Sequence, residues 1–577
     1  MLKVEPTPMN ADRLLALFEP ISEAPDAIPR LRRFILDLAV RGKLVEQDPE
    51  DEPAGELLRE MGSRFKRLKI TKKQVPLEAK EIPFALPDRW QWTRLGQICE
   101  KTGSGSTPRG GKEAYVETGI PFLRSQNVYN DGLRLTDVVF IDEPTHQRMA
   151  GTRVLPCDLL LNITGGSIGR CAKVPADFHE ANVSQHVAII RVGMPGTEDF
   201  IHALILSPYF QSFVDTRQTG AGRGGLPKNR MDSIPVALPP LAEQHRIVAK
   251  IDELMALCDQ LEAARQEREQ CRERLVAGSL QRLNQPSDDQ EVFRSDARFA
   301  LQVLPSLATT PAHIKQLRQT ILNLAVRGKL VEQDPRDHIE GLLKKVREDQ
   351  KKAFANGAIR KPVLLSHIQE DLLFAIPPEW DWIPLGGLVV QGPQNGISPK
   401  ETTNPDAPKA LTLAATTTGK LRPDFFKAVD LRPEQALPYR LAEGDLLFQR
   451  GNTREYVGMA AIYAIQPGNF IFPDLMIRVR LSDSLCLAYV HLALTSPPLR
   501  DYFSALATGS SETMPKINQG ILCDAPIPLP PLAEQHRIVA KVDALMALCD
   551  QLEQQLSQAE QSRRGLLEAV LREALAG

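Results

Sequence analysis

The spacing of apolar residues is most regular in two long stretches, one near the middle and one at the end of the chain. In the later stretch apolar residues recur at alternating steps of four and three, at Ile538, Val542, Leu545, Cys549 and Leu552. The earlier stretch follows the same rule at Ile247, Ile251, Leu254, Cys258 and Leu261. This spacing is typical of a coiled-coil seam. We expect two long helices that pair with each other. The alternative is that each helix packs on its own part of the protein.

The regions that precede the long helices have a mixed pattern. Short apolar runs rich in branched side chains predict strands at 138–142, 159–164 and 186–192. The spacing of amphipathic helices is found at 198–214 and 487–503. Strands and helices interleaved in this way predict domains of the α+β class.

The chain is a tandem duplication. The stretch LRRFILDLAVRGKLVEQDP at 31–49 recurs at 317–335 with 16 of 19 positions identical, and LPPLAEQHRIVAKIDELMALCDQLE at 238–262 recurs at 529–553 with 23 of 25 identical. Between them, FALPDRWQWTRLG at 84–96 recurs as FAIPPEWDWIPLG. The offsets are 286, 291 and 290, so each repeat is the size of a domain.

Between these blocks the two halves diverge, and residues 97–237 and 387–528 share only sparse anchors. Asp158-Leu159-Leu160 matches Asp445-Leu446-Leu447, and Pro227-Lys228 matches Pro515-Lys516. A shared fold with different surface residues explains this pattern. Two nearly identical scaffolds then present two unlike surfaces.

Composition narrows the class of protein without indicating a ligand. The chain has 577 residues, 42% of them apolar and 25% charged, which is typical of a folded protein with several domains. No apolar run is long enough to cross a bilayer, and we see no secretory signal, so the cytoplasm is the expected compartment. The eight cysteines form no C-x-x-C pair, which argues against a zinc site. The net charge of −2 means that any DNA-binding surface must arise from local clustering.

The order of blocks resembles the specificity (S, HsdS) subunits of type I restriction-modification systems. The resemblance covers nearly the whole chain and rests on LPPLAEQHRIV before each long helix. It also rests on the Pro-x-x-W-x-W segments that open the variable regions, at Pro87, Trp90 and Trp92 and again at Pro378, Trp380 and Trp382. Gly-Asp-Leu-Leu at 444–447 also fits, whereas the first copy has Cys157 in place of the glycine. For the four tryptophans we expect core packing rather than base stacking.

This resemblance implies a fold and a role. It implies two target recognition domains of mixed α/β structure in a tandem pseudo-two-fold repeat, separated by long helices that pair as a coiled coil. Each domain would read one half of a bipartite, asymmetric DNA site, and the helices would set the spacing and dock two methyltransferase subunits. Restriction (motor) subunits would join for cleavage of foreign DNA. Adenine N6 methylation from S-adenosylmethionine, and cleavage driven by ATP and Mg²⁺, would belong to those partners, so no cofactor is expected on this chain.

The sequence agrees with a non-catalytic role. None of its Pro-Pro pairs has the neighbours of the [DN]-P-P-[FY] loop with which amino-methyltransferases grip a base. The segment 105–113 comes nearest to a phosphate-binding loop and fails at Ser106 and Glu113. Rival hypotheses are a stand-alone DNA methyltransferase or nuclease with fused recognition domains, and a structural coiled-coil adaptor that binds no nucleic acid.

Candidate DNA contacts in the first domain are cationic, amide or hydroxyl side chains on glycine-rich or polar loops, because such groups reach phosphates and base edges. The basic segment 217–230 contributes four, and the polar segment 123–132 contributes five. A solvated loop and a turn stabilised by its own asparagines are the respective alternatives. With two from the first glycine-rich loop, the candidates are Thr107, Arg109, Arg124, Ser125, Gln126, Asn127, Asn130, Arg223, Lys228, Asn229 and Arg230.

In the second domain the segment 508–520 is taken as the counterpart of the basic segment. It is less basic and contains Glu512. Two further loops, at 392–400 and 450–454, add polar and basic side chains. The candidates are Gln394, Asn395, Lys400, Arg450, Asn452, Arg454, Ser510, Ser511, Lys516 and Asn518.

The repeats and composition shifts together predict seven regions. Helical repeat regions at 1–81 and 311–372 each precede a target recognition domain, at 82–238 and 373–528. Spacer helices follow at 239–283 and 529–577, and 284–310 links the two halves.

Overall fold

The computed structural model of the protein describes residues 24, 26–72, 75–217, 225–285, 289–361, 373–465, 470–509 and 514–576. These residues form two compact units. Unit 1 contains the chain up to Arg268 together with the segment from Glu560 onward, and unit 2 contains Glu269–Ala559. Each long helix therefore contributes residues to both units.

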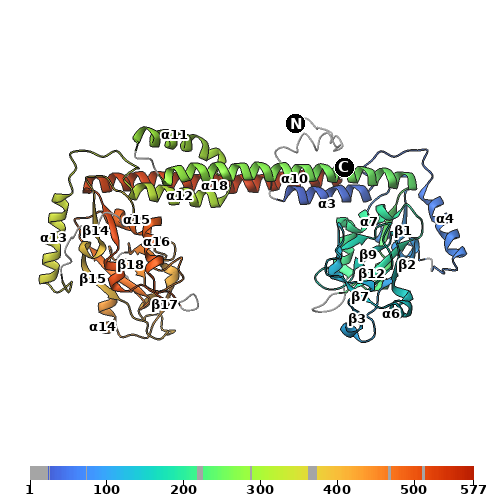
Figure 1. Ribbon diagram of the computed structural model, residues 1–577, viewed down its shortest axis with the longest axis horizontal. Coiled ribbons are helices and arrows are strands. Elements are labelled where there is room, and N and C mark those ends of the chain that lie inside the picture. Colours follow the sequence, from blue (N-terminus) through green and yellow to red (C-terminus); the bar gives the residue numbers. More distant parts are fainter. Residues whose placement is uncertain are drawn as a thin grey trace. The chain divides into compact units, whose positions relative to one another are not determined.

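Unit 1 contains the first domain and its helices (Figure 1). Its helices are α3 (Ala27–Val40), α4 (Ala54–Arg67), α5 (Leu95–Ile98), α6 (Glu143–Arg148), α7 (Glu198–Leu206), α8 (Pro208–Arg217), α9 (Lys228–Asp232) and the first part of α10 (Leu241–Asn284). Its strands are β1 (Gln91–Arg94), β2 (Cys99–Ser104), β3 (Tyr115–Val116), β4 (Ile120–Leu123), β5 (Val128–Tyr129), β6 (Gly132–Leu133), β7 (Val139–Ile141), β8 (Arg153–Val154), β9 (Leu159–Asn162), β10 (Cys171–Lys173), β11 (Ala181–Val183), β12 (Val187–Val192) and β13 (Pro235–Leu238).

Unit 2 repeats this plan. Its helices are α11 (Gln290–Leu307), α12 (Pro311–Val326), α13 (Glu340–Ala355), α14 (Pro433–Ala436), α15 (Leu487–Thr495), α16 (Pro497–Leu506), α17 (Gln519–Cys523) and most of α18 (Leu532–Ala576). Its strands are β14 (Asp381–Pro384), β15 (Val389–Asn395), β16 (Lys409–Leu411), β17 (Phe426–Ala428), β18 (Leu446–Gln449), β19 (Ala460–Ile462), β20 (Phe470–Ile471), β21 (Met476–Leu481) and β22 (Pro526–Leu529). The segment 284–310, expected only as a connection, contains α11.

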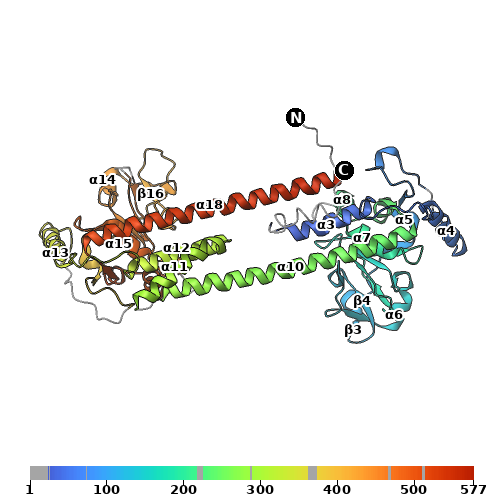
Figure 2. The ribbon, with the colours of Figure 1, turned by 90° about the horizontal axis from the view of Figure 1, so that it is seen from above.

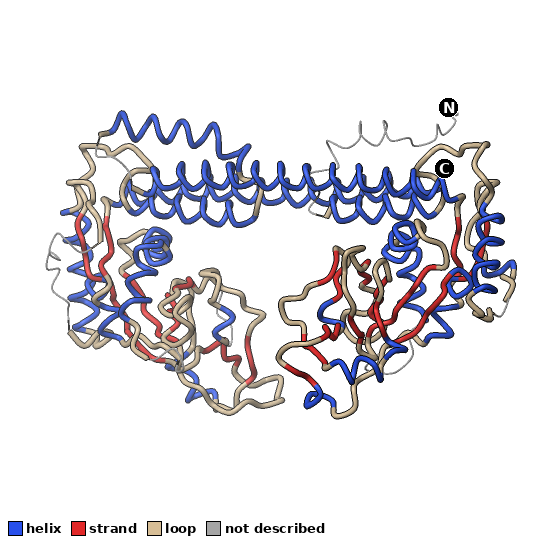
Figure 3. Tube along the Cα trace, turned by 45° about the vertical axis from the view of Figure 1, so that its right-hand side comes forward, coloured by secondary structure: helices blue, strands red, loops and turns tan. Residues whose placement is uncertain are grey.

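The sheets of the two units correspond strand for strand near the helices. The four-stranded sheet β10-β9-β12-β2 of unit 1 matches β19-β18-β21-β15 of unit 2, with antiparallel neighbours throughout. The pairs β1-β13 and β14-β22 also match. The second sheets differ, because unit 1 has the five strands β3-β7-β4-β11-β8 and unit 2 has the three strands β17-β16-β20. In each unit the strands lie on one side of the long helices (Figure 3).

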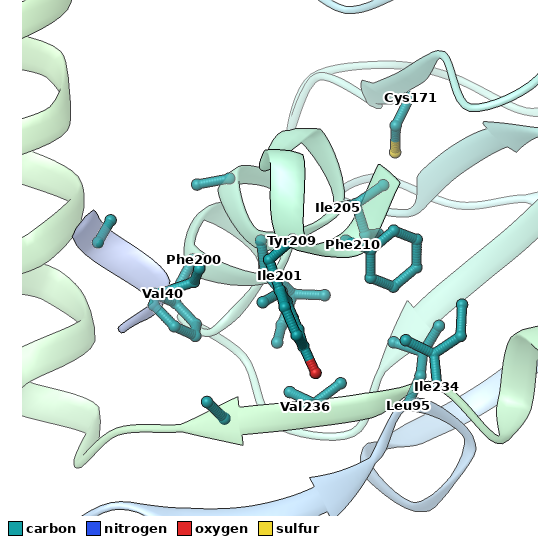
Figure 4. Close-up of a cluster of buried hydrophobic side chains, with 14 of the residues drawn as sticks. Val40, Leu95, Cys171, Phe200, Ile201, Ile205, Tyr209, Phe210, Ile234 and Val236 are labelled. Atoms are coloured by element: carbon teal, nitrogen blue, oxygen red, sulfur yellow. The ribbon is translucent and has the colours of Figure 1, made fainter. Parts of the chain in front are cut away.

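A core of large apolar side chains joins the sheet of unit 1 to its helices. The two helices α7 and α8 pack on α3, and α7 also packs on β10. Phe200, Ile201, Tyr209 and Phe210 are buried here against Val236 of β13 (Figure 4). The hydroxyl of Tyr209 is buried with them and donates to the Pro235 carbonyl at 3.0 Å. This packing fixes the domain to α3.

The amphipathic segments 198–214 and 487–503 were each expected as one helix, and each is two. The breaks fall at Ser207 and Ser496, which have extended backbones with ψ of 151° and 153°. Proline follows both serines, and it disfavours the helical conformation in the residue before it. The predicted strands at 138–142, 159–164 and 186–192 are confirmed as β7, β9 and β12.

The apolar stripes of the long helices are covered within their own halves. Ile247, Ile251 and Cys258 are buried in one cluster with residues of α3, such as Leu31 and Ile35, and Leu254 and Leu261 pack at its edge. Figure 2 shows α3 alongside the first half of α10. In unit 2, Ile538, Val542 and Cys549 are buried with residues of α12, and Leu545 and Leu552 pack at the edge. These contacts match the alternative in which each helix packs on its own half. Direct pairing of one stripe with the other stays a prediction.

The far ends of the long helices join the opposite unit. Leu567, Val570 and Leu571 at the end of α18 are buried in the unit 1 cluster that contains α3. In unit 2, Val276, Leu280 and Leu283 at the end of α10 are buried with Leu324 of α12 and Ala300 of α11. The fold class is confirmed as two tandem α+β domains separated by long helices. None of the helices in the described ranges is both long and apolar enough to cross a membrane.

Candidate nucleic-acid interface

The three repeated sequence blocks meet at one buried carboxylate in each unit. In unit 1 the Trp90 indole donates to Glu243 Oε2 at 3.0 Å, and the Gln47 amide donates to Glu243 Oε1 at 2.8 Å. Arg246 on the same helix forms an ion pair with Asp51 at 2.6 Å. Together these residues come from all three blocks or their flanks. The blocks are therefore alike between the halves because they contact one another.

Unit 2 repeats this junction. Trp380 donates to Glu534 Oε2 at 3.0 Å, Gln333 approaches Glu534 Oε1 at 3.5 Å, and Arg537 pairs with Asp337 at 2.9 Å. Burial raises the pKa of both glutamates, and the hydrogen bonds from the indole and the amide partly offset that rise. The expected core packing of Trp90, Trp380 and Trp382 is confirmed, and Trp92 is half-buried. The junction orients each domain on its long helix.

A buried ion pair holds the central strands of each domain. Asp158, which is 1% exposed, accepts from Arg191 at 2.7 and 2.8 Å, and Asp445 accepts from Arg480 at 2.7 Å. Each aspartate also accepts a backbone N–H three residues before it, from Leu155 and Ala442. The Asp-Leu-Leu anchor shared by the two variable regions is therefore part of the scaffold.

The strand after each ion pair ends in a buried amide that fixes a surface loop. Asn162, the last residue of β9, donates to the Ser125 carbonyl at 2.9 Å and to Ser167 Oγ at 3.1 Å. Gln449, the last residue of β18, donates to the Leu413 carbonyl at 2.8 Å and to Thr416 Oγ1 at 3.0 Å. Both amides are fully buried. The same position thus anchors the turn that follows an equivalent strand, β4 or β16, and these two turns differ in sequence.

Next to these amides two backbones cross closely. A Cβ on Gly105 would lie 1.9 Å from the Val183 carbonyl oxygen, and one on Gly396 would lie 2.2 Å from that of Phe472. Glycine is therefore required where β2 and β15 lead into their loops. Both domains consequently present loops from the same end of the four-stranded sheet.

In the second domain three predicted segments come together at that end. Gly451 and Thr508 each form a β-bridge with Lys516, and the Ile517 N–H donates to the Arg450 carbonyl at 2.9 Å. The Asn452 N–H donates to the Pro515 carbonyl, and Gln519 Nε2 donates to Asn395 Oδ1 at 3.2 Å. We name this surface the β18-end cluster, with members Asn395, Arg450, Asn452, Lys516 and Gln519.

The other candidate residues of the second domain lie outside the β18-end cluster. Gln394 accepts from Arg478 and donates to the Pro438 carbonyl, so its amide is used inside the domain. Arg454 donates to the Ser504 carbonyl on α16 at 2.8 Å. Asn518 caps α17, because its Oδ1 accepts from the Ile521 N–H at 2.8 Å. Lys400 is exposed on the loop after β15. Ser510 and Ser511 lie outside the described residues.

In the first domain the polar segment 123–132 is mostly used within its own turn. Asn127 is 1% exposed, accepts from the Arg124 N–H and donates to the Arg134 carbonyl, so it cannot reach a base edge. For this residue the prediction of base contact was wrong, and the self-stabilised turn is correct. Arg124 donates to the Asp137 carbonyl, and Asn130 accepts from the Cys171 N–H. Ser125 is half-buried, and Gln126 is exposed.

The basic segment of the first domain lies partly on α9. Lys228, Asn229 and Arg230 are exposed there, and Lys228 Nζ contacts Asp232 and lies 2.5 Å from Thr102 Oγ1. Thr107 and Arg109 are exposed on the loop after β2, and Arg223 lies outside the described residues. Lys228 begins α9 as Gln519 begins α17, so its structural counterpart is Gln519. The sequence match of Pro227-Lys228 to Pro515-Lys516 was three residues out of register.

The structure adds polar residues at the same sheet end that sequence patterns missed. In the first domain Thr164 Oγ1 lies 2.6 Å from His186 Nδ1, and the exposed Gln185 precedes that histidine. In the second domain the exposed Asp474 accepts from Ser398 Oγ at 2.5 Å. Gln185 and Asp474 each stand two residues before an equivalent strand, β12 or β21. Single polar residues in short turns gave no signal by which to find them.

The two domains are equivalent scaffolds that present unlike polar loops from the same end of a sheet, which defines a tandem binding protein. Among the described residues, no group of three or more His, Cys, Asp or Glu side chains is placed to hold a metal ion.

Comparisons with known proteins give the family. The family model "Type I restriction modification DNA specificity domain" matches twice, at residues 87–269 and 379–561. The EcoEI specificity subunit of Escherichia coli is 31% identical over 575 residues, which cover 95% of this chain and 94% of that protein. The EcoAI specificity subunit of Escherichia coli is 30% identical over 568 residues, which cover 94% and 93%. A crystal structure of the HsdS subunit from Thermoanaerobacter tengcongensis covers 86% of this chain and 99% of its own, at 19% identity and a TM-score of 0.44. The chain belongs to the family of type I restriction-modification DNA specificity subunits.

Proposed function

We propose that this chain is the non-catalytic DNA-recognition subunit of a type I restriction-modification complex. Each domain reads one half of a bipartite, asymmetric site through the loops at the end of its four-stranded sheet. The rival hypothesis of a stand-alone methyltransferase or nuclease is not favoured, because full-length relatives are named as specificity subunits.

One observation supports this proposal above the others. The scaffolds of the two domains place the same partners around Glu243 and Glu534 and around Asp158 and Asp445, whereas the loops that they hold differ in sequence. Two matching scaffolds with unlike surfaces are expected of a protein that binds two different sequences. An adaptor without DNA binding gives no reason for the unlike loops.

The chemistry of the complex belongs to partner subunits in this proposal. Two methyltransferase subunits dock on the repeated helical regions and methylate adenine N6 with S-adenosylmethionine. Restriction subunits supply cleavage with ATP and Mg²⁺. The near identity of the two helical regions fits this arrangement, because two copies of one partner need two equal docking surfaces.

Methylome sequencing tests the function directly. Cells that express this chain with its neighbouring methyltransferase should carry N6-methyladenine in one two-part motif, and cells with the methyltransferase alone should not. Binding of S-adenosylmethionine by the isolated chain, or methylation without the partner, would support the stand-alone enzyme instead.

The role of the long helices in spacing is tested by a deletion. Removal of seven residues from the exposed middle of α10 removes about 10 Å of helix rise, so the gap between the two half-sites should shorten by about three base pairs. A gap of unchanged length would show that the helix does not set the spacing.

A further inference from the structure

A second positively charged feature lies beside each recognition domain, outside the loops already described. Figure 1 shows α4 and α13 each along the side of its own domain. Buried Leu57, Met61 and Phe65 fix α4 to unit 1, and buried Leu342 and Val346 fix α13 to unit 2. The remaining faces of these helices are open to solvent.

These open faces are strongly basic. Residues 59–72 contain six Lys or Arg and one Glu, and residues 344–361 contain seven Lys or Arg and two acids, so each segment carries a net charge of +5. Because the whole chain carries −2, the rest of it carries −12. Positive charge is therefore concentrated at two equivalent places. On α13 and in the segment that follows it, the cations at 344, 345, 347, 351, 352, 360 and 361 are all exposed.

The two segments hold equivalent places although their sequences differ. Each helix ends in the same turn, with the Ile70 N–H bonded to the Phe65 carbonyl and the Ala358 N–H bonded to the Ala353 carbonyl. In this frame Arg59, Arg64 and Lys72 match Arg347, Lys352 and Arg360, whereas the cations at 66, 67, 69, 344, 345 and 351 have no cationic counterpart. Charge is kept, and the identity of the side chains is not.

This difference separates two classes of partner. The blocks at 31–49 and 238–262 are nearly identical to their repeats, as expected where two copies of one protein dock. A surface that holds the same protein at α4 and α13 should be equally alike. A polyanion such as the DNA backbone requires only exposed positive charge, because its phosphates repeat regardless of sequence.

Both basic segments also adjoin the candidate interface of their own unit. Arg360 and Lys361 line a groove of about 610 Å³ together with Gln394 and Gln519. In unit 1, Lys72 lies close enough to Lys228 for the two charges to interact, and burial is the main cause of its lowered pKa. The basic faces therefore continue the surface on which the recognition loops lie.

We propose that the basic faces of α4 and α13 bind phosphates of the duplex next to each half-site and supply affinity without sequence preference. This inference rests on the proposed function and adds to it a separate, electrostatic part of the binding surface. Base contacts by the loops would decide which site is bound, and these faces would decide how the binding responds to salt.

The test neutralises one face in the complete complex with the methyltransferase subunits. Lys344, Lys345, Arg347 and Lys351 are changed together to Gln, and the affinity for the methylated motif and for random DNA is measured from 50 to 300 mM salt. The slope of log affinity against log salt concentration should become less negative by about two to four, since each phosphate contact contributes about 0.9 to that slope. Both DNAs should lose affinity alike, by about tenfold or more at 150 mM salt.

Two controls make the result specific. Changing Lys344, Lys345 and Lys351 to Arg should keep the slope, because the charge remains. Changing three exposed cations of α18 outside the repeated block, Arg563, Arg564 and Arg572, to Gln removes positive charge elsewhere and should leave the slope unchanged. Thermal unfolding of each variant confirms that the exposed changes leave the fold intact.

Three results would overturn the inference. The first is a wild-type slope in the neutralised variant. The second is an equal change of slope in the α18 control. The third is loss of the methyltransferase subunits from the variant, which would assign the face to a protein partner. A wild-type complex with no preferred DNA sequence would instead refute the proposed function, so the two failures are distinguishable.

Discussion

The two recognition domains of this chain share one scaffold and differ in the loops that the scaffold holds. Their four-stranded sheets have the same strand order, and the ion pairs Asp158–Arg191 and Asp445–Arg480 lie at matching places in those sheets. The second sheets have five strands in one domain and three in the other. The difference teaches that the four-stranded sheet near the long helices is fixed by contacts with the repeated sequence blocks, whereas the second sheet, farther from the helices, is free to vary.

The loops follow the same division. Asn162 and Gln449 occupy one position at the end of a central strand, and each holds the turn after an equivalent strand, although the two turns differ in sequence. The first domain then presents Gln185 where the second presents Asp474. Small changes on an equal frame therefore yield two unlike surfaces, and this comparison can be tested in both domains with matched variants.

The largest effect is expected from exchange of a whole variable region. Replacing residues 97–237 with the matching region of a relative should change one half of the methylated motif and leave the other half unaltered. Each mismatched base pair costs about 1–3 kcal/mol, so binding to the original site should fall to the nonspecific level. Motif sequencing is the measurement. A change in both halves, or in neither, would contradict independent reading by the two domains.

The next effect concerns the junction at which Trp90 and Trp380 contact the buried glutamates. Trp90→Ala and Trp380→Ala should each destabilise their own unit by about 3–5 kcal/mol, because both rings are buried and both indoles donate to a buried glutamate. Denaturant unfolding, followed by hydrogen exchange in each unit, measures the two losses. Markedly unequal losses would show that the two junctions are not equivalent.

A smaller effect is expected at the matched positions in the loops. A carboxylate only accepts hydrogen bonds and is repelled by phosphates, so Asp474 is suited to the cytosine amino group, whereas Gln185 can both donate and accept, as adenine requires. Asp474→Asn should change preference at one base pair of one half-site by about 1–3 kcal/mol. Gln185→Glu should do so in the other half-site. Binding to a library of sites measures both, and a uniform loss across all sequences would argue against base contact.

The smallest effect concerns pH. Burial raises the pKa of Glu243 and Glu534 in the folded state, so folding favours the protonated form of both. Their contribution to stability is then largest below the pKa that each glutamate has in the unfolded chain. It decreases as pH rises through the pKa of the same glutamate in the folded protein. Glu243→Gln removes this dependence and loses about 1 kcal/mol of hydrogen bonding. Relative to the wild type, the variant should be more destabilised at pH 4 than at pH 7, as thermal melts would show. A constant difference across pH would contradict the raised pKa.

The sequence was sufficient where the same residues recur. The blocks around Trp90 and Glu243 had to form the same junction twice, because nearly identical sequences fold alike. The strands β7, β9 and β12 were also predictable, since each is a short apolar run. The breaks at Ser207 and Ser496 were readable in principle from the prolines that follow them.

The candidate interface was only partly predictable. The sequence marked Arg450, Asn452 and Lys516 as polar or basic, but only the folded chain brings the two segments together through β-bridges. It could not show that Asn127 is buried, because an asparagine that closes its own turn and one that faces DNA have the same local sequence. The register of Lys228 against Gln519 depended on helix starts that follow loops of unequal length.

By itself the sequence determined that there are two equal scaffolds, two unlike domains and two long helices. Tertiary structure decided what covers the apolar stripes of those helices, which are buried by α3 and α12 of their own halves. The physical reason is that periodicity shows that a helix face must be buried, whereas the choice of the covering surface depends on all the faces that compete for it. The same holds for the loops, because the sheet decides which loops lie next to each other and their order along the sequence does not.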